Sequence, residues 1–373
     1  MRAPVTVTAA LRKFVGDYRR VHWPTHRQDD VLDWLCACRT SALGGRMVKC
    51  ACGWSSPMYN SCTDRHCPQC RGGVRAEWLA ARCEQLLPVP HFQVVFTLPG
   101  ALRTIARDNQ QLVYGLLFTA SAETIQQLTA QRFDAQPGVL AMLHTWTNEL
   151  IFHPHVHCLV TAGGLRLDHE AWVQTRPDYL FPQRVMAAMF RGKVTEGLRA
   201  AFDAGEVVVR GDPAHARVGF DAAVREAHRH RWVVHVEAPA GRPAENAAKY
   251  LARYVGGIAI SDARMVAISD TDVSWKTRKG VVTVKGHEFV RRFAQHILPK
   301  RFRRVRYYGL YAPGNVHTRW AKARKLLGAP QPAERPERPV RTCPECGGPV
   351  SERSIPGLSW SRPQRPPRAR GPP

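Results

Sequence analysis

Two short motifs combine residue types that can carry out a reaction together. The first, His-Pro-His-Val-His, contains His155 and His157, and the second, Tyr-Leu-Ala-Arg-Tyr, begins at Tyr250 and ends at Tyr254. Alternate residues of a strand share a face, so the two imidazoles would point the same way and form a site for a divalent metal ion. Residues at i and i+4 of a helix also share a face, so the two phenols would stack. The combination predicts a reaction that cuts single-stranded DNA through a phosphotyrosine.

This reaction needs both residue types. A phosphodiester is negatively charged and repels nucleophiles, so a divalent ion must neutralise it and hold it in line. Tyrosine attacks as a phenolate and forms an ester that conserves the bond energy, so rejoining needs no ATP. We predict Mg²⁺ or Mn²⁺ as the ion, with a third protein ligand from a neighbouring strand or turn. The candidates for that ligand are His144, Asn148 and Glu149, and we favour His144.

Each motif also has an ordinary structural explanation. Histidines in a strand are more often core or surface residues than metal ligands. Two tyrosines at helical spacing more often pack in a core than act as nucleophiles. Their joint occurrence in one strongly basic chain favours the catalytic interpretation.

Basic residues near these motifs are candidates for contacts with DNA. Lys249 and Arg253 flank the tyrosines and would hold the DNA backbone or the charge that develops during the reaction. The segment 291–308 interleaves cations with aromatic side chains, a pattern that suits backbone tracking with base stacking. Within it we predict DNA contacts from Arg303, Arg304 and Arg306. The alternative for all of these residues is a solvated helix or strand face.

The charge of the chain indicates a polyanionic partner. Its 373 residues include 54 Lys and Arg against 30 Asp and Glu, which gives a net charge of +24 and a pI near 10.2. Nucleic acid is the default partner for such a chain. We find no apolar run of about 18 residues, the length of a membrane span. The first residues lack the apolar core of a secretion signal, so we expect a cytoplasmic protein without membrane contact.

The cysteines indicate structural zinc. Eight of the eleven lie between residues 36 and 83, and without a secretion signal such a cluster is expected to bind metal rather than form disulfides. Thiolates presented from tight turns assemble tetrahedral Zn²⁺. We predict at least one structural zinc, with His66 as a further spare donor, and with ligands drawn from Cys50, Cys52, Cys67, Cys70, Cys62 and Cys38.

A separate cysteine pair, Cys343-Pro-Glu-Cys346, lies far along the chain from this cluster. One pair alone cannot fill a tetrahedral site. Two alternatives stay open at this point: the pair completes a site with a distant partner, or it holds no metal.

Hydrophobic patterns predict an α+β fold. Strands are expected at residues 91–97, 138–146, 154–160, 232–237 and 303–308, with the second and third forming a hairpin. Helices are expected at residues 101–131, at 287–297, and in the tyrosine segment, which Gly256 and Gly257 would end. This order predicts an antiparallel sheet with helices packed on it. Both histidines would lie on a central strand that faces the tyrosine helix.

Three regions follow along the chain. Residues 1–85 are predicted to form an amino-terminal zinc-binding domain that contacts DNA. Residues 86–327 are predicted to form the endonuclease domain. Residues 328–373 are rich in Pro and Arg without periodicity, so we expect a basic, mostly disordered tail.

The motifs together resemble the insertion-sequence 91 family of transposases. The resemblance covers roughly residues 30–315, with the motifs in family order, and it rests on residues 38–45, 60–70, 86–99, 153–160, 250–254 and 307–310. The chain departs from the family pattern at Arg46, where relatives commonly carry His. It departs again at Cys50-Ala-Cys52, which is shorter than the usual spacing.

The resemblance implies an amino-terminal zinc domain and a His-hydrophobic-His endonuclease with two tyrosines, which moves DNA by rolling-circle transposition. It implies that His155 and His157 bind the catalytic metal and that Tyr250 and Tyr254 are the nucleophiles. One tyrosine would become linked to the 5′ end of a nicked strand, and the host replication machinery would extend the freed 3′-OH.

Other functions share some of these features. A plasmid rolling-circle replication initiator or a conjugative relaxase would use the same chemistry, although the zinc cluster argues against both. A non-enzymatic zinc DNA-binding regulator would use the histidine and tyrosine motifs only structurally. A ribosomal or RNA-binding protein is a further alternative, but only the positive charge of the chain supports it.

Overall fold

The computed structural model describes residues 5–70, 84–176, 178, 180–239, 259–328 and 341–355. These residues fall into two compact units. Unit 1 comprises residues 5–70, 259–297 and 341–355, and unit 2 comprises residues 84–239 and 298–328. The predicted tyrosine helix lies outside the described residues, together with Tyr250, Tyr254, Lys249 and Arg253.

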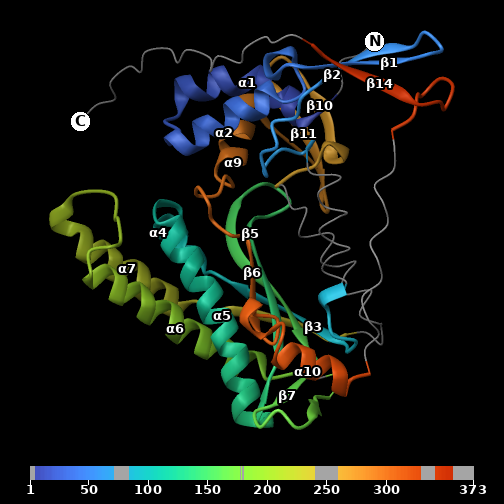
Figure 1. Cartoon of the computed structure of the whole chain (residues 1–373). Coiled ribbons are helices and arrows are strands. Elements are labelled where there is room, and N and C mark those ends of the chain that lie inside the picture. The colour runs from blue at the N-terminus through green and yellow to red at the C-terminus, as the bar shows by residue number, and fades with distance from the viewer. Residues whose placement is uncertain are drawn as a thin grey trace. The chain divides into compact units, whose positions relative to one another are not determined.

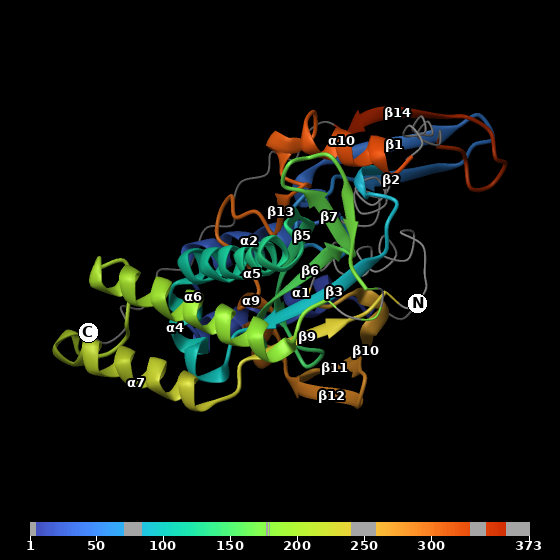
Figure 2. The same cartoon turned by 90° about the horizontal axis from the view of Figure 1, so that it is seen from below.

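Unit 2 is built around a five-stranded antiparallel sheet (Figure 1; Figure 2). Its strands lie in the order β13 (Val305–Gly309), β5 (Gly138–Trp146), β6 (Phe152–Thr161), β3 (His91–Thr97) and β9 (Val233–Glu237). The predicted α+β fold with an antiparallel sheet is therefore confirmed, and so is the hairpin of β5 and β6. The strand that carries His155 and His157 is the central one, as the sequence predicted.

Helices cover one face of this sheet. Figure 1 shows α5, α6 and α7 on the same side of the strands; the helices of this layer are α4 (Arg103–Asp108), α5 (Gln110–Phe133), α6 (Gln183–Asp203) and α7 (Ala216–Arg229). The core beneath them takes alternate residues of β6, namely Val156, Cys158 and Val160. Because successive side chains of a strand point to opposite faces, His155 and His157 face away from these helices.

A smaller apolar cluster covers part of the opposite face. It contains Leu140 and Met142 of β5, Leu159 of β6, and Leu310 and Tyr311 after β13. The remaining elements of unit 2 are β4 (Ala135–Gln136), β7 (Gly163–Arg166), β8 (Trp172–Gln174), α10 (Arg319–Leu326) and the 3₁₀ turns η2 (Gly100–Leu102), η3 (Pro213–His215) and η5 (Pro313–Asn315). Strands β4, β7 and β8 form a separate three-stranded sheet.

A buried histidine is bonded to this smaller cluster. The hydroxyl of Tyr311 forms a hydrogen bond with Nε2 of His91 at 2.7 Å and accepts one from the amide of Leu87 at 3.1 Å. Burial lowers the pKa of His91 to about 4, whereas a histidine in an unfolded chain has a pKa of about 6.5. As the pH falls, the unfolded state therefore binds the proton first, and stability is lost between about pH 6.5 and pH 4.

We expect a His91→Gln variant to show a flatter pH dependence of the free energy of unfolding. Each pKa unit corresponds to about 1.4 kcal/mol, so the loss between pH 7 and pH 4 should be about 3 kcal/mol smaller than in the wild type. Denaturant unfolding at a series of pH values measures this difference. The exposed His317 gives a matched control, because His317→Gln should keep the wild-type slope. An unchanged slope in His91→Gln would contradict the expectation.

Unit 1 joins two amino-terminal helices to two small antiparallel sheets. Helices α1 (Val7–Val21) and α2 (His26–Ala37) begin after Thr6 and Thr25, whose side chains accept hydrogen bonds from the first turn. One sheet has the order β14-β1-β2 and the other the order β10-β11-β12. The elements are β1 (Gly45–Cys50), β2 (Ser55–Tyr59), β10 (Met265–Ile268), β11 (Asp272–Thr277), β12 (Gly280–Lys285), α9 (Gly286–Ala294), β14 (Val350–Ile355), η1 (Ser41–Leu43) and η4 (Asp262–Arg264).

Helix α9 packs against α1, although we predicted that residues 86–327 form one domain. Gly286 permits this contact, because a Cβ built there would lie 2.1 Å from the ring of Phe14. Phe289, Val290 and Phe293 are buried on the same helix. The domain boundary is therefore corrected: residues 259–297 belong with the amino-terminal helices.

The predicted tail also requires a correction. Figure 1 shows β14 beside β1, and the two strands pair antiparallel from Gly45 opposite Ile355 to Cys50 opposite Val350. Residues 341–355 are thus part of a sheet and not of a disordered tail. These residues are polar and show no alternation of apolar side chains, so the sequence pattern did not indicate a strand. Their pairing depends on main-chain hydrogen bonds to β1.

In the described ranges, no helix has both the length and the apolar character that a membrane crossing requires.

Candidate active site and metal centres

Three histidines meet on the face of the central sheet that lies opposite α4 to α7. His155 and His157 come from β6, and His144 of β5 lies directly across from His155. Their ligand nitrogens all lie within 4.8 Å of one another, and the ring centroids are 4.6 to 5.5 Å apart. The structure thus brings together the three histidines predicted as ligands. Asn148 and Glu149, the other candidates, lie in the turn between β5 and β6.

Burial keeps the imidazoles of His155 and His157 neutral. It lowers the pKa of His155 to about 4 and the pKa of His157 to about 3. Nδ1 of His155 donates a hydrogen bond to the carbonyl oxygen of His153 at 2.7 Å. In the neutral ring of His155 the proton is therefore on Nδ1, and Nε2 keeps its lone pair. This tautomer can bind a metal ion through Nε2 without a further change. His155 and His157 can therefore bind a divalent cation at neutral pH without first releasing a proton.

An aromatic and two cationic side chains surround the histidines. Trp146 stacks on His144 with centroids 4.8 Å apart, and the guanidinium of Arg304 lies 5.8 Å from the centroid of Trp146. Arg103 donates to Nδ1 of His153 at 2.9 Å. Sequence reasoning missed Trp146, although its position two residues after His144 on one strand was a usable signal. It also missed Arg103, for which a separation of 50 residues gave no signal.

The three basic residues predicted near β13 have different surroundings. Arg303 is exposed, and Arg304 is half-buried beside Trp146. Arg306 packs on the rings of Phe118 at 4.6 Å and Phe302 at 5.3 Å, on the helix-covered face of the sheet. Of the three, Arg304 is therefore the one that reaches the surroundings of the histidines, whereas Arg306 lies on the other face.

A basic cavity of about 590 Å³ lies beside the edge strand β9. Arg184 and Arg191 of α6 line one side of it, and Arg231, Trp232 and His235 line the other. The guanidinium groups suit the phosphates of a nucleic-acid backbone, whereas Trp232 is buried in the core. The sequence analysis did not identify this cavity, because its two sides come from segments that are separate in the chain.

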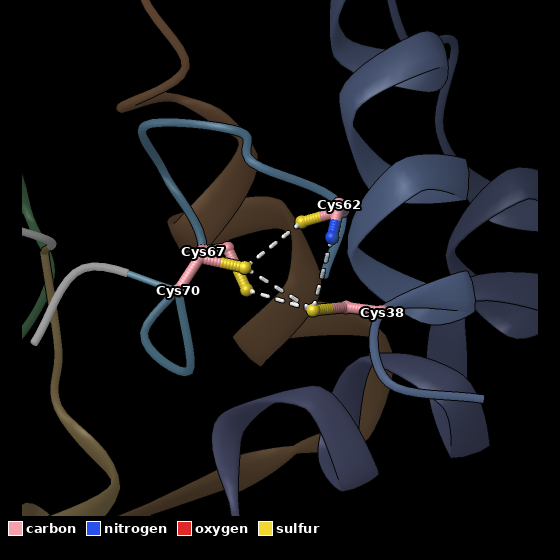
Figure 3. A group of neighbouring side chains, drawn as sticks. All are labelled: Cys38, Cys62, Cys67 and Cys70. Carbon is pink, nitrogen blue, oxygen red and sulfur yellow. Dashed lines mark hydrogen bonds between the residues drawn. The ribbon is translucent and has the colours of Figure 1, made fainter. Parts of the chain in front are cut away.

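Eight cysteines of unit 1 form two separate groups of four, and Cys36 belongs to neither. The first consists of Cys38, Cys62, Cys67 and Cys70, whose side chains converge in Figure 3. The sulfur of Cys38 lies 3.3 Å from that of Cys70 and 3.5 Å from that of Cys67, and Cys62 lies 3.6 Å from Cys70. Four thiolates at about 2.3 Å from a tetrahedral zinc ion lie about 3.8 Å apart. This group therefore fits one zinc ion.

Each ligand of this first group comes from the end of an element or from a tight turn. Cys38 is the residue that ends α2, and Cys62 follows β2. Cys67 begins the turn to Cys70, and its amide donates to the carbonyl of Asp64 at 3.1 Å. His66, the predicted spare donor, lies outside the group and bonds through Nδ1 to the carboxylate of Asp64 at 2.7 Å.

The second group consists of Cys50, Cys52, Cys343 and Cys346. The sulfurs of Cys50 and Cys346 are 3.4 Å apart, and those of Cys52 and Cys343 are 3.7 Å apart. The six cysteines predicted as zinc ligands therefore divide between two groups. The distant partner of the Cys343 pair, which the sequence left open, is the pair Cys50 and Cys52.

Two protein families match parts of the chain. A family described as "Putative transposase" matches residues 138–319, a range that contains the three histidines. A family described as "Transposase zinc-binding domain" matches residues 10–98, a range that contains the Cys38 group. Together with the antiparallel sheet and the cysteine-rich unit, these matches define the class: the chain is a transposase, a DNA-cleaving enzyme with DNA as its partner.

Comparison with individual proteins defines the family. The chain is 38% identical to "Putative transposase y4qJ" of Sinorhizobium fredii, over 92% of this chain and 94% of that protein. It is 27% identical to "Transposase for insertion sequence element IS801" of Pseudomonas savastanoi pv. phaseolicola, over 74% of this chain and 68% of that protein. No solved structure matches the chain. The chain belongs to the insertion-sequence 91 family of transposases, and the zinc-domain match together with the cysteine groups supports structural zinc.

Proposed function

We propose that this transposase nicks and rejoins single-stranded DNA at the ends of its element through 5′-phosphotyrosine intermediates, and so drives rolling-circle transposition. The observation that chiefly supports the proposal is the group of His144, His155 and His157 on the central strands of an antiparallel sheet. A DNA regulator without catalysis would have no use for three imidazoles whose ligand nitrogens converge within 4.8 Å of one another.

The three histidines would hold one divalent cation, Mg²⁺ or Mn²⁺. When bound, the cation would neutralise charge on the scissile phosphate and polarise its phosphorus–oxygen bonds. The donor set is all nitrogen, whereas Mg²⁺ prefers oxygen ligands. We therefore expect Mn²⁺ to support cleavage at a lower concentration than Mg²⁺.

The chain itself supplies the nucleophile. The phenolate oxygen of one tyrosine, Tyr250 or Tyr254, forms a bond to the phosphorus, and the bond from phosphorus to the 3′ oxygen breaks. The phenol proton leaves to solvent, the 3′ oxygen takes up a proton, and the 5′ phosphate stays esterified to the tyrosine. The other tyrosine repeats this step on the second strand, so cleavage and rejoining alternate, while the freed 3′-OH is extended by the host replication machinery.

Cationic residues would position the strand during these steps. Lys249 and Arg253 flank the tyrosines in the sequence and would hold the phosphate next to the nucleophile. Arg304 lies beside Trp146, which stacks on His144, so its guanidinium is placed to contact the same phosphate or its neighbour. The basic cavity beside β9 offers a further contact for the single strand.

The proposal is tested with purified protein and labelled single-stranded oligonucleotides from the element ends, in the presence of Mn²⁺ or Mg²⁺. We expect a metal-dependent nick in which the 5′-phosphate fragment is covalently joined to the protein. Peptide mapping of the adduct should identify Tyr250 or Tyr254. Tight binding without a covalent product, for both metals and several end sequences, would instead favour a non-enzymatic DNA-binding protein.

Replacing the tyrosines one at a time should separate their roles. We expect Tyr250→Phe and Tyr254→Phe each to bind single-stranded DNA as the wild type does and to block complete transposition, since each variant lacks one of two nucleophiles. The double variant should form no covalent adduct. Tyr59→Phe, at an exposed position on β2, is the matched control and should be fully active. Full transposition by both single variants would exclude a mechanism with two nucleophiles.

A further inference from the structure

The carboxy-terminal cysteine pair completes a metal site that lies beyond the matched zinc domain. That domain ends at residue 98 and the transposase match ends at residue 319, so Cys343 and Cys346 belong to neither. Their sulfurs nevertheless lie 3.7 and 3.4 Å from those of Cys52 and Cys50. These separations exceed the 2.05 Å or so of a disulfide and approach the roughly 3.8 Å between thiolates on a tetrahedral zinc ion.

Both cysteine pairs are held in tight turns. The amide of Cys50 donates to Trp54 and that of Gly53 donates to Cys50, in a turn where Gly53 has φ +92°. The amide of Cys343 donates to Gly348 and that of Gly347 donates to Cys343, in a turn where Gly347 has φ +72°. The positive φ values favour glycine at both positions. Each turn thus presents two thiols from one side of a short loop.

The strands bring the two turns to the same end of one sheet. Cys50 is the last residue of β1 and pairs with Val350, the first residue of β14. The bridge between Thr342 and Pro349 closes the turn that carries Cys343 and Cys346, directly before β14. The order β14-β1-β2 therefore forms a three-stranded ribbon with four thiols at one tip. We use the name ribbon for residues 45–59 and 341–355.

The ribbon has almost no apolar core. Among its described side chains, only Val48 and Cys343 are buried. Its ion pairs link Glu352 to Arg46 and to Arg341 at the surface, where such pairs contribute little stability. A sheet of three strands needs an apolar face or another support to be stable. A metal ion at the tip would supply that support, because metal binding to a site absent from the unfolded chain contributes directly to folding.

We propose that Cys50, Cys52, Cys343 and Cys346 bind a second structural zinc ion. This ion closes a zinc ribbon whose two halves are separated by 291 residues along the chain, from Cys52 to Cys343. It holds residues 341–355 on the amino-terminal hairpin and is distinct from the Cys38 site. The inference does not rest on the tyrosine mechanism, because metal content is measured without cleavage.

The test counts zinc in the full-length chain, purified under reducing conditions from zinc-supplemented cells. The count is made in a His155→Ala, His157→Ala background, which removes the nitrogen site that would otherwise bind zinc. We expect two zinc ions per chain by elemental analysis. Adding Cys343→Ser and Cys346→Ser should leave one. The control Cys36→Ser changes a cysteine outside both groups and should leave two.

A second measurement does not depend on a folded variant. In the zinc-loaded chain, Cys50, Cys52, Cys343 and Cys346 should resist alkylation by N-ethylmaleimide until a chelator is added, although Cys52 and Cys346 are exposed. Mass spectrometry reports each cysteine separately. One zinc ion per chain, or rapid alkylation of Cys343 and Cys346 before the chelator is added, would overturn the proposal.

Discussion

Replacing His155 and His157 together by glutamine should abolish strand cleavage while DNA binding and the zinc of the two cysteine groups stay unchanged. A bound cation contributes several kcal/mol to the transition state of phosphoryl transfer, and each 1.4 kcal/mol or so is a factor of ten in rate. We therefore expect a loss of about a thousandfold or more in single-turnover cleavage of an end oligonucleotide. Gel-shift titration and elemental analysis measure DNA binding and zinc in the same preparation.

His153→Gln is the matched control for this experiment. His153 is on the same strand, but it is not one of the three converging ligands and bonds to Arg103 instead. We expect the cleavage rate of this variant to stay within about tenfold of the wild-type rate, because it loses a single hydrogen bond, to Arg103. His144→Gln tests the third ligand and should behave like the double variant. Normal cleavage by the His155, His157 variant at all Mn²⁺ concentrations would refute a catalytic role for the site.

Removing zinc from the Cys38 group should unfold the amino-terminal helices of unit 1. Zinc contributes about 10–16 kcal/mol to the folding of zinc-finger peptides, which equals or exceeds the stability of about 5–15 kcal/mol of a typical domain. Three of the four cysteines are buried, so the unmetallated site would leave a defect next to α2. We expect Cys67→Ser, Cys70→Ser to make residues 5–70 sensitive to brief proteolysis.

Cys36→Ser is the control for that loss. Cys36 also lies on α2, but it belongs to neither cysteine group, and burial raises its pKa to about 11, so it stays a neutral thiol. We expect this variant to keep its zinc and its protease resistance. If the Cys67, Cys70 variant resisted proteolysis as the wild type does, the Cys38 group would not be what holds the amino-terminal helices together.

The strands at the centre of the sheet could be predicted from the sequence, because the residues that specify them lie close together in the chain. Strand β6 has alternating histidines and apolar residues, and the short link from β5 makes their pairing nearly obligatory. The same pairing brings His144 opposite His155, which is why a third ligand from the neighbouring strand was a sound expectation. Here the side-chain pattern, the hairpin and the site all depend on residues 138–161.

Long-range pairing could not be predicted in the same way. The contact of Gly286 with Phe14 and the pairing of β14 with β1 join segments that share no local pattern. Polar residues such as Glu352 in β14 indicate a solvated segment when read alone. The division of the predicted cysteines into two groups has the same cause, since Cys50 and Cys52 find their partners at Cys343 and Cys346.

The pairing of β1 with β14 has a consequence for how the protein is made. A ribosome adds about 5–20 residues per second, so the 291 residues from Cys52 to Cys343 take roughly 15–60 s to synthesise. During that time the nascent chain carries β1 with one edge unpaired, and an unpaired edge is a surface for wrong strand partners. β1 therefore gains its second strand partner only after β14 has been synthesised. Chains released early keep the histidine strand but leave this edge open, which makes them targets for aggregation or degradation.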